Sequence, residues 1–280
     1  MRDPHPAVRM AAAEMLFPVL NIDKDQAVAW YVMACEEDLR VGASPRGIEF
    51  YNYTIPSHLE QIGPIIRRMV FSNVDEVVKE GARQVTARQI FHCCFQDEFQ
   101  LCQTGSVPQR QGVAEAAASL FHTPRHMADC QIILLRLLND PAREIRDKVR
   151  NLFRGESNML NNTALKPFIL KFIDSQTFAD DPTVFIWLIK EHYTGSILFL
   201  KDILFSLCET IIRKVPEQSR ERSTGLAHDV SELVSLILRL YEQSITESQG
   251  ETTSRCLDIW DDFFQNRVGI VHELAKAIEQ

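Results

Sequence analysis

The sequence predicts an all-α protein, an α-solenoid made of successive helix pairs, and three observations support this prediction. A short signature occurs twice, as DPHPAVR at residues 3–9 and as DPAREIR at residues 140–146. Weaker copies begin at Asn73, Val107 and Asp181, so that successive starts lie 34, 33 and 41 residues apart, the range in which one repeat is a helix pair. Strand signals, such as Asn-Gly turns and alternating apolar and polar residues, are rare.

Each signature is expected to start a helix. Asp3 and Asp140 are expected to be N-caps, because a carboxylate accepts a hydrogen bond from an unpaired amide of the first turn. The proline that follows each has the backbone angle of a first helical position and no amide to leave unpaired. Apolar residues then recur at helical spacing, for example at Ile145, Val149 and Leu152, so one face of each helix should be buried.

The repeat array is expected over residues 1–194 and a helical carboxy-terminal cap over 195–280. The cap has longer helices, which is typical of a terminal repeat because one of its faces meets water. Since a signature already begins at Asp3 with no partner helix before it, we expect either that the natural array continues upstream, which is favoured, or that something else covers that face. The expected helices outside the signatures span residues 23–40, 57–71, 124–138, 165–173, 195–214, 217–245, 252–265 and 269–279.

Composition excludes several classes of protein. Thirty Lys and Arg residues against 38 Asp and Glu residues give a net charge of −8, which repels the phosphates of nucleic acid. Seven cysteines, two of them adjacent, do not form the pattern of a disulfide framework, and no secretory signal precedes them, so we expect a cytoplasmic protein. The longest apolar stretch, residues 195–212, contains Lys201, Asp202 and Glu209, so we expect a buried helix and no membrane span.

No motif predicts catalysis or cofactor binding. The chain lacks the phosphate-binding string GxxxxGK[ST] and the nucleophile elbow GxSxG. Paired carboxylates such as Asp261 and Asp262 are expected on charged, solvated faces. We therefore name no catalytic residue, expect no cofactor, and do not expect this chain to be an enzyme.

Two groups of histidines and cysteines have the residue types of a metal site. His122, His126 and Cys130 are spaced four residues apart, and imidazole and thiolate both suit zinc. A buried thiol at Cys130 on the apolar face is the favoured alternative. The second group, His92, Cys93, Cys94 and Cys102, lacks the paired short spacing of structural zinc sites, so packing at a helix end is favoured there and no metal is expected.

The segment GIEFYNYTI, residues 47–55, concentrates aromatic side chains. Phe50 is expected in the core. Tyr51 or Tyr53 is a candidate partner contact, because tyrosine combines rigid contact area with a polar tip. On that hypothesis, Tyr51→Ala leaves thermal stability nearly unchanged.

The Asp-Pro start, the Val or Ile four residues after the proline, the Arg that follows it and the interval of 33 to 41 residues resemble HEAT repeats over residues 3–192. In that family an Asp and an Arg from successive repeats stack into a ladder along the solenoid. The resemblance implies that Asp3 with Arg9 and Asp140 with Arg146 form such a ladder. Asn73 and Val107 depart from the pattern, so the ladder should be interrupted there.

A second resemblance covers residues 56–280. The strings NDPAREIRDKVRNLF, KPFILKFIDSQTF, LILRLYEQS and SRCLDIWDDFFQNRVGIVHELAKAIEQ are similar to the carboxy-terminal region of bacterial STAND-type ATP-binding proteins. There, a NACHT-like switch precedes a helical array that senses or holds a trigger, often in anti-phage defence. This implies a non-catalytic interaction, scaffolding or sensor arm of a larger NTPase, with a protein partner and an upstream NTPase domain.

Two other functions remain open. One is a free-standing HEAT-repeat adaptor. The other is a HEAT-like nucleic-acid-processing enzyme, which the net charge of −8 disfavours because such an enzyme needs a cationic concave surface.

Overall fold

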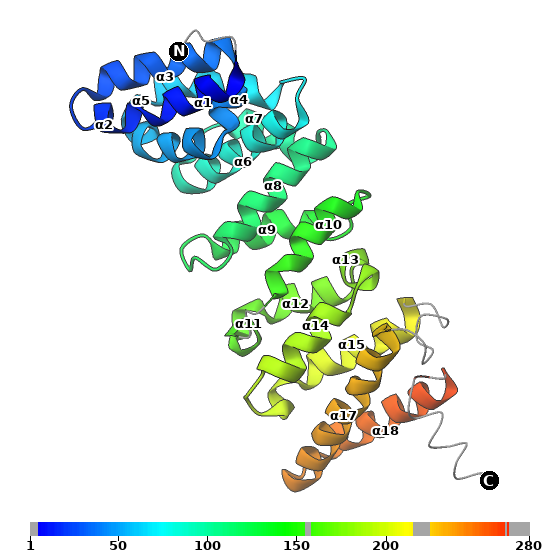
Figure 1. Ribbon diagram of the computed structural model, residues 1–280. Coiled ribbons are helices and arrows are strands. Elements are labelled where there is room, and N and C mark those ends of the chain that lie inside the picture. Colours follow the sequence, from blue (N-terminus) through cyan, green and yellow to red (C-terminus); the bar gives the residue numbers. More distant parts are fainter. Residues whose placement is uncertain (1–4, 155–157, 215–224, 267, 269–280) are drawn as a thin grey trace. The chain divides into compact units, whose positions relative to one another are not determined.

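A computed structural model of the chain describes residues 5–154, 158–214, 225–266 and 268. All regular secondary structure in these residues is helical, which confirms the all-α prediction (Figure 1). Within the same ranges, no helix is both long enough and apolar enough to cross a lipid bilayer. The helices form two compact units, Met1–Leu134 and Leu135–Gln280.

The division between the units differs from the expected boundary after residue 194. It falls inside α9 (Met127–Leu137). Helices on the two sides of residue 194 pack on each other instead, since α12 contacts α15 and α14 contacts α17. The segment after residue 194 is therefore part of a larger unit.

The first unit contains eight helices before α9 in its described residues. The longest, α5, contacts both helices that precede it and helices that follow it in the chain. These helices are α1 (Pro6–Glu14), α2 (Leu16–Leu20), α3 (Lys24–Glu37), α4 (Arg40–Ala43), α5 (Pro45–Val70), α6 (Asp75–His92), α7 (Gln96–Thr104) and α8 (Val107–Leu120).

The second unit combines short and long helices. The segment 151–163 is rich in Asn, Ser, Thr and Gly, which is typical of a loop, but its described part contains short helical turns. The elements after α9 are α10 (Arg143–Arg150), η1 (Asn151–Phe153), α11 (Asn158–Asn161), η2 (Thr163–Leu165), α12 (Lys166–Ile173), α13 (Gln176–Asp180), α14 (Thr183–Trp187), η3 (Leu188–His192), η4 (Ile197–Leu200), α15 (Lys201–Lys214), α17 (Gly225–Thr246) and α18 (Gly250–Gln265). The helix expected at 269–279 lies outside the described residues.

The two signatures start their helices later than expected. α1 begins at Pro6, and its N-cap is His5, whose Nδ1 accepts a hydrogen bond from the Ala7 amide at 3.3 Å. α10 begins at Arg143 with Ala142 as N-cap. Asp140 is therefore not the N-cap, and its carboxylate accepts from the Ala142 amide at 2.9 Å, in the turn that precedes the helix. Asp3 lies outside the described residues, but both helices begin three residues after the signature aspartate.

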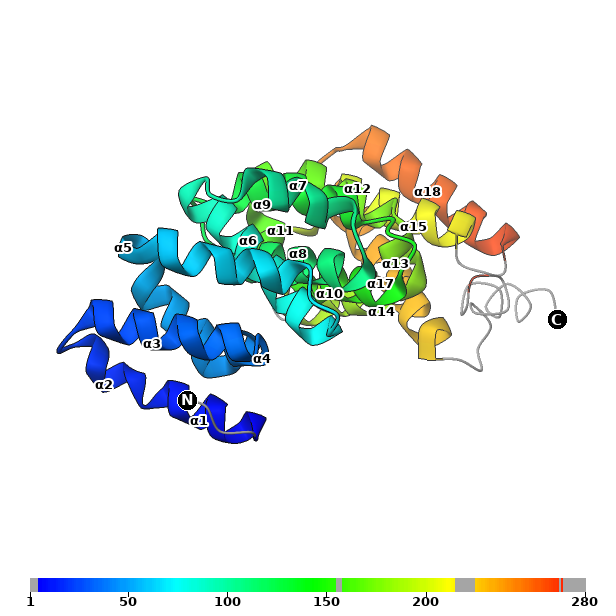
Figure 2. The same cartoon turned by 90° about the horizontal axis from the view of Figure 1, so that it is seen from above.

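The α5 helix bends at His58, whose φ of −133° and ψ of 33° are not helical. Pro56 lies two residues before the bend and weakens the helix there, because it has no amide to donate to the carbonyl one turn earlier. The bend gives α5 two arms. Figure 2 shows α3 lying between the α1–α2 pair and α5, in agreement with the contacts that α3 makes with α2 and α5.

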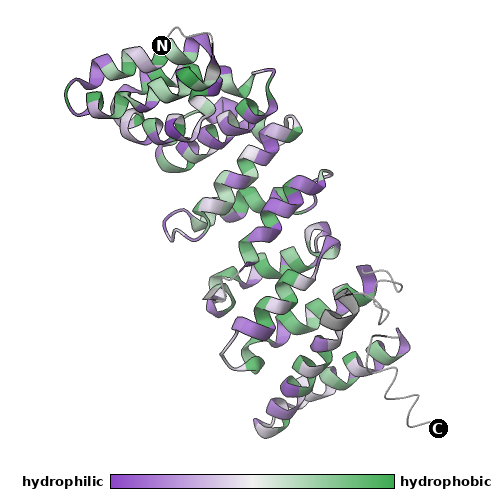
Figure 3. Ribbon diagram, in the orientation of Figure 1, coloured by the Kyte–Doolittle hydropathy of each residue, from purple (hydrophilic) through white to green (hydrophobic). Residues whose placement is uncertain are grey.

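The core of the first unit is centred on three aromatic rings. Tyr31 of α3 stacks on Phe50 of α5 with ring centroids 4.1 Å apart, and Tyr51 meets Tyr31 edge to face at 5.7 Å. All three side chains are completely buried. Apolar residues of α3 and α5 are therefore buried against each other. Hydrophobic and hydrophilic residues alternate along the helices of the structure (Figure 3).

Glycines let the next helices approach closely. A Cβ at Gly112 of α8 would lie 2.1 Å from the carbonyl oxygen of Lys79 and 2.8 Å from the amide nitrogen of Arg83, both in the α6 backbone. A Cβ at Gly81 of α6 would lie 2.8 Å from the Val70 nitrogen. Hydrogen is the only side chain that fits between these backbones.

The core of the second unit is a cluster of phenylalanines. Phe153 contacts Phe172 at 4.0 Å between centroids and Phe185 at 5.1 Å, and Phe178 meets Phe172 edge to face at 5.9 Å. These rings come from η1, α12, α13 and α14. Four short elements, none of which is long enough to be stable alone, are thereby held around one apolar centre.

We predict that Gly112→Ala destabilises the protein by about 1–3 kcal/mol, because the methyl group forces α8 away from the α6 backbone. Gly250→Ala is the control: Gly250 is the first residue of α18, and a Cβ there would meet nothing within 4 Å. That variant should be neutral or more stable, by up to about 1 kcal/mol. Urea denaturation measures both, and equal stability of the two variants would contradict the close approach.

Candidate protein-binding surface

The signature arginines both bind carboxylates of a later helix or turn. Arg9 of α1 contacts Asp38 at 2.5 Å, and Arg146 of α10 contacts Asp180 at the end of α13 at 2.6 Å. Within its own signature, Arg146 donates to the backbone oxygens of Asp140, at 2.5 Å, and of Pro141, at 3.1 Å. The expected pairing of Asp3 with Arg9 lies outside the described residues.

These contacts lower the pKa of both acceptor carboxylates. Hydrogen bonds from Arg40, and then from Arg9, hold the pKa of Asp38 well below its usual range. Burial acts to raise the pKa of Asp180, but the hydrogen bonds from Arg146 and Gln176 outweigh it, and the net shift is downward. Both aspartates are therefore ionised anchors that join one helix to another.

The two candidate tyrosines have different environments. Tyr51 is completely buried, and its hydroxyl donates to the Met69 sulfur at 3.2 Å, so it is not a surface contact, and its burial now predicts that Tyr51→Ala lowers stability. Tyr53, which lies about 200° further around α5, is 55% exposed and meets the Phe17 ring in a T-shaped contact, at 6.1 Å between centroids. Tyr53 remains available to a partner.

The two groups of histidines and cysteines that have the residue types of a metal site do not form one in the described residues. Cys130 and Cys102 are buried, and burial raises the pKa of each thiol to about 12. Cys93 is exposed just after α6, where its φ of 54° ends the helix. Among the described residues, no three His, Cys, Asp or Glu side chains are grouped so as to hold a metal ion.

A Ser-His-Asp chain that the sequence analysis missed lies at the bend of α5. Ser57 Oγ is 2.8 Å from His58 Nδ1, and His58 Nε2 is 2.8 Å from Asp25 Oδ1. These groups resemble an acyl-transfer triad, but the Asp25 side chain is 93% exposed, so water competes for the carboxylate that would have to orient the imidazole. These hydrogen bonds instead join the start of α3 to the bend of α5. Asp25 and His58 are 33 positions apart in the sequence, so no local sequence pattern could predict their contact.

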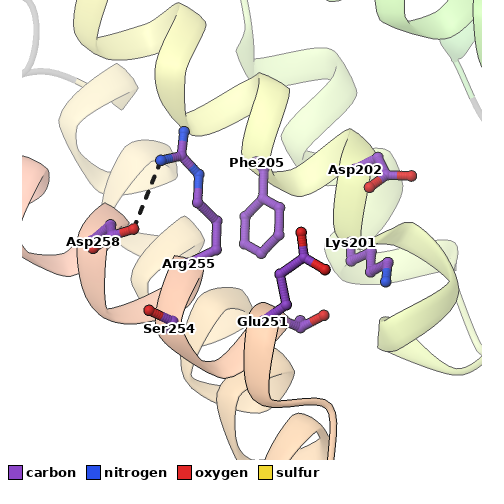
Figure 4. A pocket seen from close by; sticks show the side chains of 8 residues that line it. Lys201, Asp202, Phe205, Glu251, Ser254, Arg255 and Asp258 are labelled. Atoms are coloured by element: carbon purple, nitrogen blue, oxygen red, sulfur yellow. Dashed lines mark ion pairs between the residues drawn. The ribbon is translucent and has the colours of Figure 1, made fainter.

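A polar pocket of about 540 Å³ lies between α15 and α18 (Figure 4). The Phe205 ring faces into it, flanked by Glu251 and Arg255. Its charges are largely satisfied within the protein, since Arg255 binds Glu209 and lies 3.8 Å from Asp258, and Asp202 binds Lys166. This pocket has no convergent set of groups that selects a ligand.

The outward side of α3 differs, because it exposes apolar side chains at its centre. Trp30 is 41% exposed and Met33 39% exposed, one helical turn apart, and Ala29 is exposed beside them. We call the exposed residues of this helix the α3 face; together they span an arc of about 140°. The α3 face consists of Asp25, Gln26, Ala29, Trp30, Met33, Glu36 and Glu37.

A groove runs along one edge of the α3 face. It has a volume of about 380 Å³, and its floor on α3 is apolar, formed by Val28, Ala29 and Val32. His58 and Gln61 of α5 form the opposite wall, and Asp25 closes one end. Helix α3 thus presents an exposed aromatic and thioether pair next to an apolar hollow, a combination typical of protein contact sites.

A second apolar hollow, of about 230 Å³, lies between α17 and α18 and is lined by residues such as Leu238, Leu257 and Trp260. α18 is the last described helix, and residues 269–280 follow it in the chain. We assign no partner to this hollow.

Comparisons with protein-family models, with curated proteins and with solved structures find no significant match to this chain. Its function is therefore inferred from its own surfaces and contacts.

We predict that Tyr51→Ala destabilises the protein by about 3–5 kcal/mol, because it removes a completely buried ring from the aromatic core. Tyr53→Ala, two residues away in the same helix, should change stability by less than about 1 kcal/mol. Thermal and urea denaturation measure both. Similar losses for the two variants would show that Tyr53 is as important to the core as Tyr51.

We predict a pH-dependent loss for Asp38→Asn. A depressed pKa stabilises the folded state above the pKa of the unfolded chain, about 4, and this stabilisation is lost as the pH falls through the folded value. Asp38→Asn should therefore cost about 1–3 kcal/mol at neutral pH, and the difference from wild type should shrink steadily below about pH 4. Urea denaturation between pH 7 and about pH 2 tests this, with the exposed Glu60→Gln as control. A difference that stays constant with pH would contradict the role of the Asp38 charge.

Proposed function

We propose that the protein is a non-catalytic scaffold, an α-solenoid of HEAT-like helix pairs that binds a protein partner through the α3 face. The observation that carries this proposal is the exposure of Trp30 and Met33 at the centre of one helix face, beside a groove whose α3 side is apolar. Exposed aromatic and Met side chains are enriched at protein interfaces and costly to leave in water. A partner that covers them gains apolar burial without any rearrangement of α3.

Two features support the repeat architecture in this proposal. Both signatures are followed by a helix that begins three residues after the aspartate. Both signature arginines bind an aspartate further along the chain, Arg9 across 29 residues and Arg146 across 34 residues, distances close to one repeat. The resemblance to STAND-type helical arrays points to the same role, since those arrays hold a trigger for the domain that precedes them.

The α3 face of a scaffold should be required for capture of its partner. The chain, carrying an affinity tag, is crosslinked in a lysate of its source cells, and captured proteins are quantified by mass spectrometry. We expect at least one protein that wild type captures to be reduced roughly tenfold or more with Trp30→Ala/Met33→Ala, the loss expected for removing two central apolar contacts. The captured protein is then purified and titrated against both chains.

The control is Phe71→Ala/Leu101→Ala, which removes two even more exposed apolar side chains of the same unit, at the residue that follows α5 and in α7. It should capture the partner as wild type does. Circular dichroism and thermal denaturation confirm that both double variants are folded. If every captured protein is recovered equally with the two variants, the α3 face is not the binding surface and the proposal fails.

A further inference from the structure

The acidic residues of the α3 face lie at its two ends and leave the centre apolar. Asp25 occupies the first turn, Glu36 and Glu37 the last, and all three are exposed. Eleven residues separate Asp25 from Glu36, which at the rise of an α-helix is about 16 Å. The face therefore has the charge order acidic, apolar, acidic.

These carboxylates are not neutralised by the protein's own cations. In the described part of the chain, none of the three forms an ion pair with a lysine or an arginine, and the recorded partner of Asp25 is His58. Lys24, the basic residue of α3 nearest to Asp25, lies on the opposite side of the helix from Met33. The α3 face thus has carboxylates at both ends that no lysine or arginine of the described residues neutralises.

This arrangement selects among partner chemistries. Anionic lipid and nucleic acid are repelled by the carboxylates at both ends. A partner helix satisfies both parts of the surface, because apolar side chains at positions i, i+3, i+4 and i+7 form one stripe and basic residues before and after the stripe reach the two acidic ends. About eleven helical residues cover the 16 Å between those ends.

We propose that the α3 face binds a basic amphipathic helix of the partner protein. The apolar stripe of that helix packs on Ala29, Trp30 and Met33, and its terminal lysines or arginines approach Asp25 at one end and Glu36 with Glu37 at the other. This proposal rests on the proposed scaffold function and adds the class of partner.

The probe for this proposal is a pair of fluorescein-labelled peptides of 16 residues, built on about four helical turns. One has leucines at i, i+3, i+4 and i+7 with lysines at both ends, and its twin has glutamates in place of the lysines. Each is titrated with the full chain, and fluorescence anisotropy reports binding at low and at physiological salt. We expect the lysine peptide to bind at least about tenfold more tightly than its twin, by a factor that shrinks as salt rises.

The variants separate charge from apolar contact. Glu36→Lys/Glu37→Lys should weaken the lysine peptide roughly tenfold at low salt, and Trp30→Ala should weaken it at all salt concentrations. Glu60→Lys/Glu242→Lys is the matched control, because it changes the net charge by the same amount at two exposed sites outside the α3 face. It should bind the lysine peptide nearly as wild type does.

Three outcomes would overturn the proposal: equal affinity for the two peptides, equal weakening by the Glu36/Glu37 and Glu60/Glu242 pairs of changes, or no effect of Trp30→Ala. Binding of the chain to vesicles containing phosphatidylserine, or a dimer that Trp30→Ala dissociates in sedimentation, would assign the face to a lipid surface or to a second copy and would also overturn it. The capture experiment tests separately whether the α3 face binds a protein at all. If the peptide test fails, the proposed scaffold function is therefore still decided by the capture experiment.

Discussion

Every helix of this protein depends on its neighbours for the burial of its apolar stripe. The helices of the second unit are mostly shorter than three turns, and isolated helices of that length are marginal in water. Their stability comes from shared centres such as the Phe153, Phe172 and Phe185 cluster, to which three separate elements contribute. In the first unit the same requirement brings α6 and α8 so close that Gly112 lies against the α6 backbone. Packing between helices, more than the propensity of each, holds the fold.

Polar contacts between side chains then fix the position of one helix against a later segment of the chain. The Arg9–Asp38 and Arg146–Asp180 pairs each join a signature helix to a later segment, and the side chains of both pairs are largely shielded from water. A shielded charge is costly without its partner, so such a pair disfavours alternative arrangements more than it adds stability. The hydrogen bond from His58 to Asp25 joins the bend of α5 to α3 in a more exposed setting. These polar contacts favour one arrangement of the packed helices over the alternatives that apolar packing alone would allow.

The α3 face follows from this packing. The α1–α2 pair covers one side of α3 and α5 covers another, which leaves the remaining side exposed. The bend at His58 directs the second arm of α5 along α3 and forms the wall of the groove. The exposed Trp30 and Met33 are thus held on a rigid helix whose opposite side is buried through Tyr31. A surface of this kind can bind a partner with little cost in ordering its own residues.

The sequence alone determined the helical class, because helix starts and apolar periodicity depend on residues within one or two turns of each other. The same local signals predicted helices at the two signatures and a new helical arm at residue 57, where α5 bends. They did not identify the α3 face, since whether Trp30 is exposed depends on α1, α2 and α5, which lie elsewhere in the chain. Nor could they separate Tyr51 from Tyr53, because both are tyrosines on one helix and only the position of Tyr31 and Met69 decides which is buried. The tertiary structure alone placed His58 on Asp25 and divided the chain after residue 134, because contacts between residues far apart in sequence leave no periodic trace in either segment.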